Sequence, residues 1–140
     1  MSNLLFAYGT LLPGRAPGEI AEAVERLRPL EQGFVRGTLY DLGEYPGAIL
    51  DSASERTIAG TVLQLPEDAD VLRQLDNYEG FDPGAPEESL FLRVLHGVTV
   101  ASGRTLPCWV YVYNRTPEPH RIVANAKHPP GQLEAEKSRE

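Results

Sequence analysis

Two segments of this chain carry residues whose types and spacing suit anion binding and proton transfer. The first is an apolar run, residues 4–8, that stops at Gly9 and continues through Thr10 and Leu11 into a Pro-Gly turn. A buried strand that ends at a glycine leaves backbone N–H groups without a ladder partner, and such groups can hold a negatively charged oxygen. The sequence therefore predicts a backbone loop at Tyr8–Leu11 that holds an anion.

The second segment contains a carboxylate on the apolar side of a predicted helix. At about 100° per residue, Val71, Leu72 and Leu75 share one arc, and Glu79 falls between the directions of Leu75 and Leu72. Glu79 also lies at the C-terminal end of the helix, just before Gly80. Burial and the helix dipole both disfavour a negative charge there, so both raise the pKa of this carboxyl. Such a group can accept and return a proton near neutral pH.

The pattern leaves a second interpretation of Glu79 open. If the helix ends one turn earlier, the side chain lies beyond the apolar arc and is simply solvated. An ordinary acidic pKa would then be expected for Glu79.

The elements that must position these residues can be read from periodicity and turn signals. A near-continuous apolar run predicts a strand over residues 3–9, and a 3.6-residue period predicts a helix over 18–28, stopped by Pro29. Asp68 is the expected N-cap of a second helix over residues 68–79. Runs rich in Val, Ile, Thr and Tyr predict further strands over residues 33–42, 47–50, 57–65, 90–101 and 105–113. Residues 102–104 are expected to join the last two strands in a hairpin. The expected fold class is α+β, a small mixed, partly open β-barrel or twisted sheet flanked by two helices.

Composition narrows the class of protein. The chain has 140 residues and a net charge of -7, which disfavours nucleic acid as a partner because phosphate binding needs clustered Lys and Arg. No apolar run approaches the roughly 20 residues of a membrane span, so no membrane partner is expected. Cys108 is the only cysteine, and no signal peptide is recognisable, so a cytoplasmic location is expected.

The character of the chain changes after Tyr113. Residues 114–140 hold four prolines, few large apolar residues and a charged end. We expect one domain over residues 1–116 and a Pro-rich charged tail over 117–140. The tail is expected to dock partly through Ile122 and Val123 and otherwise to be mobile.

Two motifs together resemble the gamma-glutamylcyclotransferase-like family. Tyr8–Leu11 is similar to the family's Tyr-Gly-[Ser/Thr]-Leu loop, and Leu75–Gly80 is similar to its Leu-Asp-x-Tyr-Glu segment. Supporting matches occur in the right order over about residues 3–115; they are Gly43–Pro46, Gly60–Leu63, Phe91–Val94 and Trp109–Tyr113.

The resemblance implies an acyl-transfer reaction on a small γ-glutamyl substrate. The α-amine of the glutamyl group attacks its own γ-carbonyl, which gives 5-oxoproline and a free amine, with neither a metal nor a cofactor. Glu79 is implied as the general acid and base. The implied substrate-binding residues are Tyr8, Gly9, Thr10, Leu11, Tyr45, Pro46 and Tyr113. The backbone of Gly9, Thr10 and Leu11 suits either the oxyanion or the substrate carboxylate.

Other functions remain open on the sequence. One is a cyclotransferase that removes a γ-glutamyl protecting group during the biosynthesis of another metabolite. Another is a binding domain, without catalysis, for an acidic small molecule. The i,i+3 pair of Asp76 and Glu79 is also a pattern of glycosidases and hard-metal sites, but no further carboxylates converge at a matching spacing. Asp76 is instead expected at the helix edge, bonded to backbone, and the three histidines show no zinc spacing.

Overall fold

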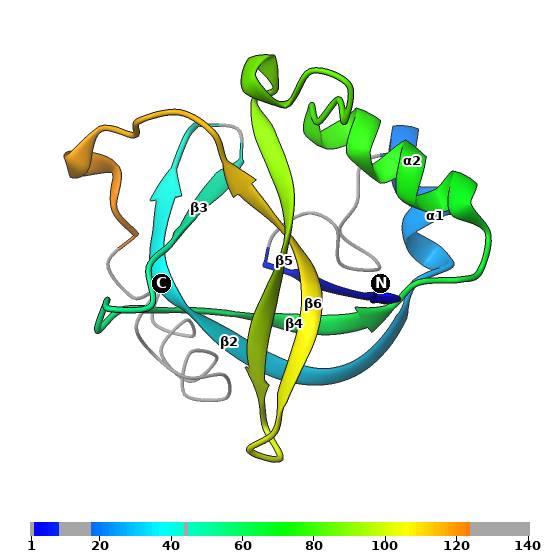
Figure 1. Cartoon of the computed structure of the whole chain (residues 1–140), viewed down its shortest axis with the longest axis horizontal. Coiled ribbons are helices and arrows are strands. Elements are labelled where there is room, and N and C mark those ends of the chain that lie inside the picture. Colours follow the sequence, from blue (N-terminus) through cyan, green and yellow to red (C-terminus); the bar gives the residue numbers. More distant parts are fainter. Residues whose placement is uncertain (1, 9–17, 44, 124–140) are drawn as a thin grey trace.

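The computed structural model describes residues 2–8, 18–43 and 45–123 of the chain (Figure 1). Within these residues it contains six strands and two α-helices. The elements, in chain order, are β1 (Leu4–Ala7), α1 (Gly18–Glu25), β2 (Arg28–Asp41), β3 (Pro46–Leu50), β4 (Thr57–Gln64), α2 (Ala69–Glu79), β5 (Phe91–Val100) and β6 (Thr105–Tyr113). Two short 3-10 turns, Pro86–Glu88 and Pro119–Arg121, complete the described chain.

Five of the strands form a closed barrel. The sheet order is β3-β2-β4-β1-β6-β5, and an additional pairing of β2 with β5 joins the two ends. The β1–β6 pair is parallel, and the other pairs are antiparallel. Strand β3 pairs with β2 outside the closed ring. This mixed barrel with two helices agrees with the α+β class expected from the sequence.

Strand β2 closes the barrel because it is long enough to reach three neighbours. Its 14 residues pair with β3, β4 and β5. At the β5 contact, Gly33 lies so close to the opposite strand that a Cβ would come within 2.8 Å of the Thr99 carbonyl oxygen. A residue without a side chain is therefore required where the barrel closes.

Helix α2 has defined signals at both ends. The Asp68 carboxylate accepts a hydrogen bond from the Asp70 N–H (2.9 Å), which makes Asp68 the N-cap, as predicted. Gly80 follows the last residue in the left-handed region, with φ of 79°. The Phe81 N–H then donates to the Asp76 carbonyl oxygen (2.9 Å). Glu79 is thus the last residue of the helix rather than a residue beyond it.

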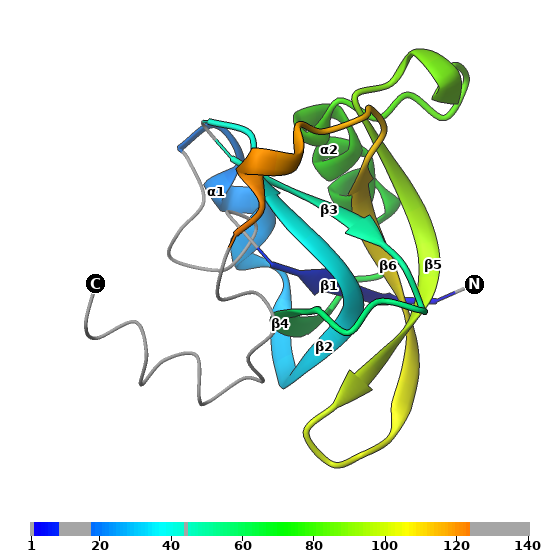
Figure 2. The same ribbon diagram turned by 90° about the vertical axis from the view of Figure 1, so that its left-hand side faces the viewer.

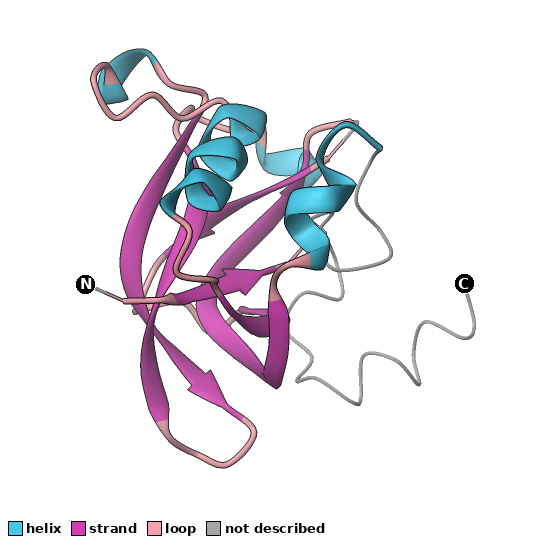
Figure 3. Cartoon of the chain, turned by 90° about the vertical axis from the view of Figure 1, so that its right-hand side faces the viewer, coloured by secondary structure: helices cyan, strands magenta, loops and turns pink. Residues whose placement is uncertain are grey.

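The two helices lie side by side against one part of the barrel wall (Figures 1 and 3). Successive residues of β1 face opposite sides of that wall, as the period of a strand requires. Leu5 and Ala7 pack with residues of α1 and α2, whereas Phe6 packs with residues that come only from strands. The molecule therefore has one core under the helices and one inside the barrel.

The first helix and first strand are shorter than predicted. The predicted helix over residues 18–28 ends at Glu25, and β2 already begins at Arg28. Pro29 thus lies inside β2, where the register shifts between Pro29 and Glu31, and such an irregularity tolerates a missing N–H. Leu27 remains buried, so its apolar character reflects packing rather than helical structure.

The chain after β6 returns to the edge of β2 (Figure 2). Ile122 forms a β-bridge with Tyr40, and the Val123 N–H donates to the Leu39 carbonyl oxygen (2.8 Å). The predicted boundary at residue 116 stays a prediction. None of the helices in the described part of the chain is long and apolar enough to span a bilayer.

Candidate functional site

The ends of five elements meet at one end of the barrel: β1, α2, β3, β5 and β6. The chain leaves β1 at Tyr8, and α2 ends at Glu79. The Leu90 N–H, just before β5, donates to the Gly80 carbonyl oxygen (3.1 Å), which ties the start of β5 to the end of α2. The first residue of β5, Phe91, is in register with Tyr113, the last residue of β6.

Tyr8 is fixed by two hydrogen bonds that join three strands. Its hydroxyl donates to the Tyr111 carbonyl oxygen on β6 (2.5 Å) and accepts from the Ala48 N–H on β3 (3.2 Å). Burial and the charge of Glu79 both raise the pKa of Tyr8, so the phenol stays protonated near neutral pH. The Tyr8 hydroxyl thus donates its proton to the Tyr111 carbonyl oxygen and accepts from the Ala48 N–H.

Glu79 has the perturbed carboxyl group that the sequence predicted. Burial raises the pKa of Glu79 from 4.5 to about 7. Among the residues described in the structure, none forms a hydrogen bond or an ion pair with its carboxylate. The charge of Glu79 raises the pKa of both Tyr8 and Tyr111, so its carboxylate lies near these two phenols. The solvated alternative for Glu79 is not what the structure shows.

Three further aromatic rings lie next to this end of the barrel. The Phe91 ring contacts Tyr113 (centroids 5.6 Å apart) on one side and Tyr45 (5.9 Å) on the other. Tyr45 is 39% exposed, which is high for a large aromatic side chain. Pro46 follows it as the first residue of β3. Tyr45 and Tyr113 thus share one partner ring, Phe91.

Gly47 allows β3 to approach this aromatic group closely. A Cβ on Gly47 would lie 2.6 Å from the Leu42 side chain and 3.2 Å from the Tyr113 Cβ. The backbone of β3 therefore packs directly on Tyr113, and Ala48, one residue on, reaches the Tyr8 hydroxyl. The structure thus connects the two groups of predicted residues through β3.

The predicted site residues consequently fall into three sets. Glu79 and Tyr8 lie close together. Tyr45, Pro46 and Tyr113 form an adjoining aromatic wall. Gly9, Thr10 and Leu11 lie outside the described residues, so the role assigned to their backbone stays a prediction.

Asp76 differs from its sequence-based expectation. It is only 6% exposed, and its carboxylate binds side chains rather than backbone. Arg93 donates to it through Nε (2.7 Å) and NH2 (3.1 Å), and the Tyr111 hydroxyl donates to Oδ1 (2.6 Å). Sequence reasoning overlooked Arg93 and Tyr111. The sequence does carry a signal for the pair of Asp76 and Arg93. Arg93 is a cation within the strand that begins at Phe91, and Asp76 is an anion at the edge of the apolar arc of α2.

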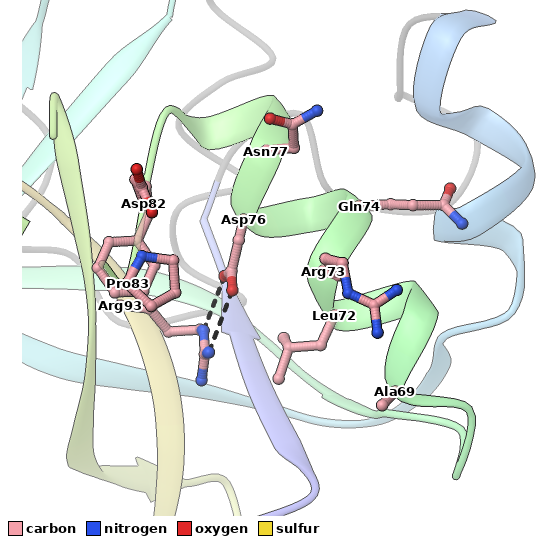
Figure 4. Close-up of a pocket in the computed structure, with 10 residues that line it drawn as sticks. Ala69, Leu72, Arg73, Gln74, Asp76, Asn77, Asp82, Pro83 and Arg93 are labelled. Atoms are coloured by element: carbon pink, nitrogen blue, oxygen red, sulfur yellow. Dashed lines mark hydrogen bonds and ion pairs between the residues drawn. The ribbon is translucent and has the colours of Figure 1, made fainter. Parts of the chain in front are cut away.

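A groove of about 700 Å³ lies beside this ion pair, between α2, the loop after it and β5 (Figure 4). Asp76 and Arg93 line it, together with Phe81 and Pro83. Glu79 and Tyr8 do not line it, so the groove is distinct from the predicted site. No cluster of three or more His, Cys, Asp or Glu side chains suited to a metal ion is found among the described residues.

Comparison of the sequence with known families identifies one match. The profile of a family described as gamma-glutamyl cyclotransferase, AIG2-like, matches residues 5–129. No curated protein sequence matches the chain.

Solved structures share the fold at low sequence identity. An AIG2-like protein from Mus musculus is 21% identical, with a TM-score of 0.67 over 90% of this chain and 87% of that one. A gamma-glutamyl cyclotransferase is 16% identical, with a TM-score of 0.62 over 99% and 86% of the two chains. YkqA from Bacillus subtilis is 20% identical, with a TM-score of 0.65. The match to YkqA covers 98% of this chain but only 43% of YkqA, so this chain spans less than half of that protein.

Proposed function

Because the chain belongs to the gamma-glutamyl cyclotransferase, AIG2-like family, we propose that it converts a γ-glutamyl amine or γ-glutamyl-amino acid to 5-oxoproline and a free amine. The observation that carries this proposal is the partly buried Glu79 carboxyl, whose pKa is raised to about 7, beside the Tyr8 phenol. A group with this pKa can act as a base and then as an acid in one turnover at neutral pH.

The proposed chemistry needs no nucleophile from the protein. The substrate's α-nitrogen forms a bond to its own γ-carbonyl carbon, and the bond from that carbon to the leaving nitrogen breaks. Starting from the neutral α-amine, Glu79 as a carboxylate accepts the proton that the α-nitrogen loses on ring closure and then donates it to the leaving nitrogen, so that the protons balance. The protein's other task is to hold the substrate folded, since a well-oriented intramolecular attack gains up to about 7–11 kcal/mol.

Tyr8 has a positioning role in this proposal. Its proton is committed to the Tyr111 carbonyl oxygen, so the phenol is not expected to act as an acid. Its oxygen, which accepts from the Ala48 N–H, is proposed to lie beside the α-nitrogen of the substrate and the Glu79 carboxyl. The hydroxyl thus orients the group from which Glu79 takes the proton.

The acyl end and the leaving group have separate proposed contacts. Backbone N–H groups of Gly9, Thr10 and Leu11 are proposed to hold the developing oxyanion or the substrate carboxylate. Tyr45, Pro46 and Tyr113 are proposed to line the leaving-amine side. The exposed Tyr45 ring offers an apolar surface on which different amines can rest.

The direct test is the product balance with a panel of γ-glutamyl amines and γ-glutamyl-amino acids. We expect 5-oxoproline and free amine in equal amounts from at least one substrate. The matched control is the same substrate acetylated on its α-nitrogen, which cannot attack and should release nothing.

Three other results would each contradict the proposal and indicate a different function. Release of glutamate instead of 5-oxoproline would indicate hydrolysis. Stoichiometric binding without release at any pH would indicate a binding domain. Turnover confined to a γ-glutamyl-protected biosynthetic intermediate would indicate a tailoring cyclotransferase.

A further inference from the structure

The last turn of α2 is attached to the barrel by a buried ion pair. Figure 4 shows the Asp76 carboxylate pointing from the helix to the Arg93 guanidinium. The contact is bidentate: two guanidinium nitrogens of Arg93 donate to the two carboxylate oxygens of Asp76, at 2.7 and 3.1 Å. The Arg93 side chain is only 14% exposed. A forked, largely buried contact fixes direction as well as distance, unlike an exposed pair.

Aromatic rings hold the cation in place. The Arg93 guanidinium lies 4.5 Å from the Trp109 ring centroid and 5.7 Å from that of Phe81. The Phe81 N–H donates to the Asp76 carbonyl oxygen at the end of the helix. Asp76 is therefore held through its backbone carbonyl and through its carboxylate.

This cluster is connected to the proposed site through Tyr111. The Tyr111 hydroxyl donates to Asp76, and its carbonyl oxygen accepts from the Tyr8 hydroxyl. Glu79 follows Asp76 by one helical turn. The titratable groups that interact electrostatically with Glu79 in the described structure are Tyr8, which follows β1, and Tyr111 from β6. Asp76 lies three residues before Glu79 on the same helix, and its charge is paired with that of Arg93 from β5.

We propose that Asp76, Arg93 and Tyr111 form a positioning unit that orients the end of α2 and keeps the charge next to Glu79 balanced. This inference rests on the proposed function. The proposal has two parts: the forked contact sets where Glu79 lies, and the two opposite charges, of which Asp76 lies three residues from Glu79 on the same helix, compensate each other. Removing one charge of the pair exposes Glu79 to the other.

The charge part is tested by following the Glu79 carboxyl carbon by NMR through a pH titration of the full chain. Asp76→Asn leaves an unbalanced cation, so the Glu79 midpoint should fall by about one pH unit. Arg93→Met leaves the negative charge of Asp76 unbalanced near Glu79, so the midpoint should rise. The double variant D76N/R93M removes both charges and should restore the midpoint. Arg73→Gln, which removes a 71% exposed cation from the same helix, is the matched control and should change nothing.

The positioning part is tested with Arg93→Lys, which keeps the charge but cannot form the fork. We expect an unchanged Glu79 midpoint and a kcat that falls by about tenfold. A merely structural role would not give opposite shifts in the single variants with restoration in the double variant.

Equal midpoints in the folded D76N and R93M variants, or shifts in the same direction, would overturn the charge part. An unchanged kcat in R93K would overturn the positioning part. If D76N does not fold, R93M and the double variant still decide the charge part. The NMR midpoints do not depend on turnover, so they remain informative even if the proposed cyclotransferase activity fails.

Discussion

Glu79 is a carboxyl group that the fold keeps largely out of water at the end of a helix. The raised pKa follows from burial, because a charge loses hydration there and no described residue compensates it with a hydrogen bond. The same environment that makes Glu79 a suitable acid and base also makes its ionised form costly.

One prediction for Glu79 concerns the pH dependence of turnover. Only the carboxylate of Glu79 can accept the proton of the α-nitrogen, so protonation below its pKa of about 7 removes the base. We expect kcat/KM to decrease about tenfold per pH unit on the acidic side of pH 7. A pH–rate profile of the wild-type protein measures this. An acidic limb with a midpoint near 4.5, the ordinary value, would contradict it.

A second prediction for Glu79 concerns stability. The folded-state pKa lies above the unfolded value, so the contribution of Glu79 is most favourable below pH 4.5 and is lost as the pH rises through 7. We therefore expect Glu79→Gln to stabilise the fold by about 2 kcal/mol more at pH 8 than at pH 5. Urea unfolding at the two pH values measures the difference. Glu87→Gln, at an exposed position, is the control and should show no such pH dependence.

At the scale of elements, the segment after β6 connects two loops at the end of the barrel that carries the candidate site. The Asn114 side chain donates to the carbonyl oxygens of Pro86 (3.2 Å) and Ser89 (2.9 Å). Further on, Arg121 donates to the Asp41 carbonyl oxygen (3.0 Å), next to the turn that carries Tyr45. One stretch of chain thus holds the loop after α2 and the β2–β3 turn.

We expect Asn114→Ala to release the loop after α2. Losing the partly buried bond to Ser89 and the exposed bond to Pro86 should cost about 1–2 kcal/mol in the free energy of unfolding. Hydrogen exchange of residues 82–89 should become faster, and KM should rise by more than kcat falls. Arg104→Ala, which removes an exposed ion pair at the opposite hairpin, is the comparison. Equal exchange in the two variants would show that Asn114 does not hold the loop.

The elements also show which features can be predicted from sequence. Helix α2, its Asp68 cap and the hairpin of β5 and β6 depend on neighbouring residues, and periodicity and turn chemistry identify them. The predicted end of α1 lies beyond the observed end at Glu25 because Leu27 is buried. Local periodicity cannot distinguish burial by tertiary contacts from the apolar side of a helix. The opposite charges of Asp76 and Arg93 are visible in the sequence, but their contact is not, because Arg93 lies 17 residues away on a strand whose position depends on barrel closure.

At the scale of the whole molecule, the barrel must be closed for the five element ends to meet. Closure depends on the β2–β5 pairing, in which Gly33 is in register with Val100. A side chain on Gly33 would press on the Thr99 carbonyl oxygen at 2.8 Å and on a Val98 methyl carbon at 2.9 Å. Closure therefore requires glycine at this position.

We expect Gly33→Val to destabilise the fold by about 1–3 kcal/mol, because the strands must separate to admit the side chain. Thermal unfolding measures the loss. Gly18→Ala is the control, since a Cβ there meets nothing within 4 Å, and it should be neutral or slightly stabilising. If the two variants had the same melting temperature, the close contact at Gly33 would not be what limits closure.

The central claim is that Glu79 transfers the proton in an intramolecular cyclisation. Its most direct test is 5-oxoproline release by Glu79→Gln alongside the wild type and Glu87→Gln, with substrate affinity measured by calorimetry. We predict that kcat falls by roughly 100-fold or more in the Glu79 variant while substrate affinity changes little, and that Glu87→Gln behaves as wild type. Release by the Glu79 variant within a few-fold of the wild type would contradict the claim.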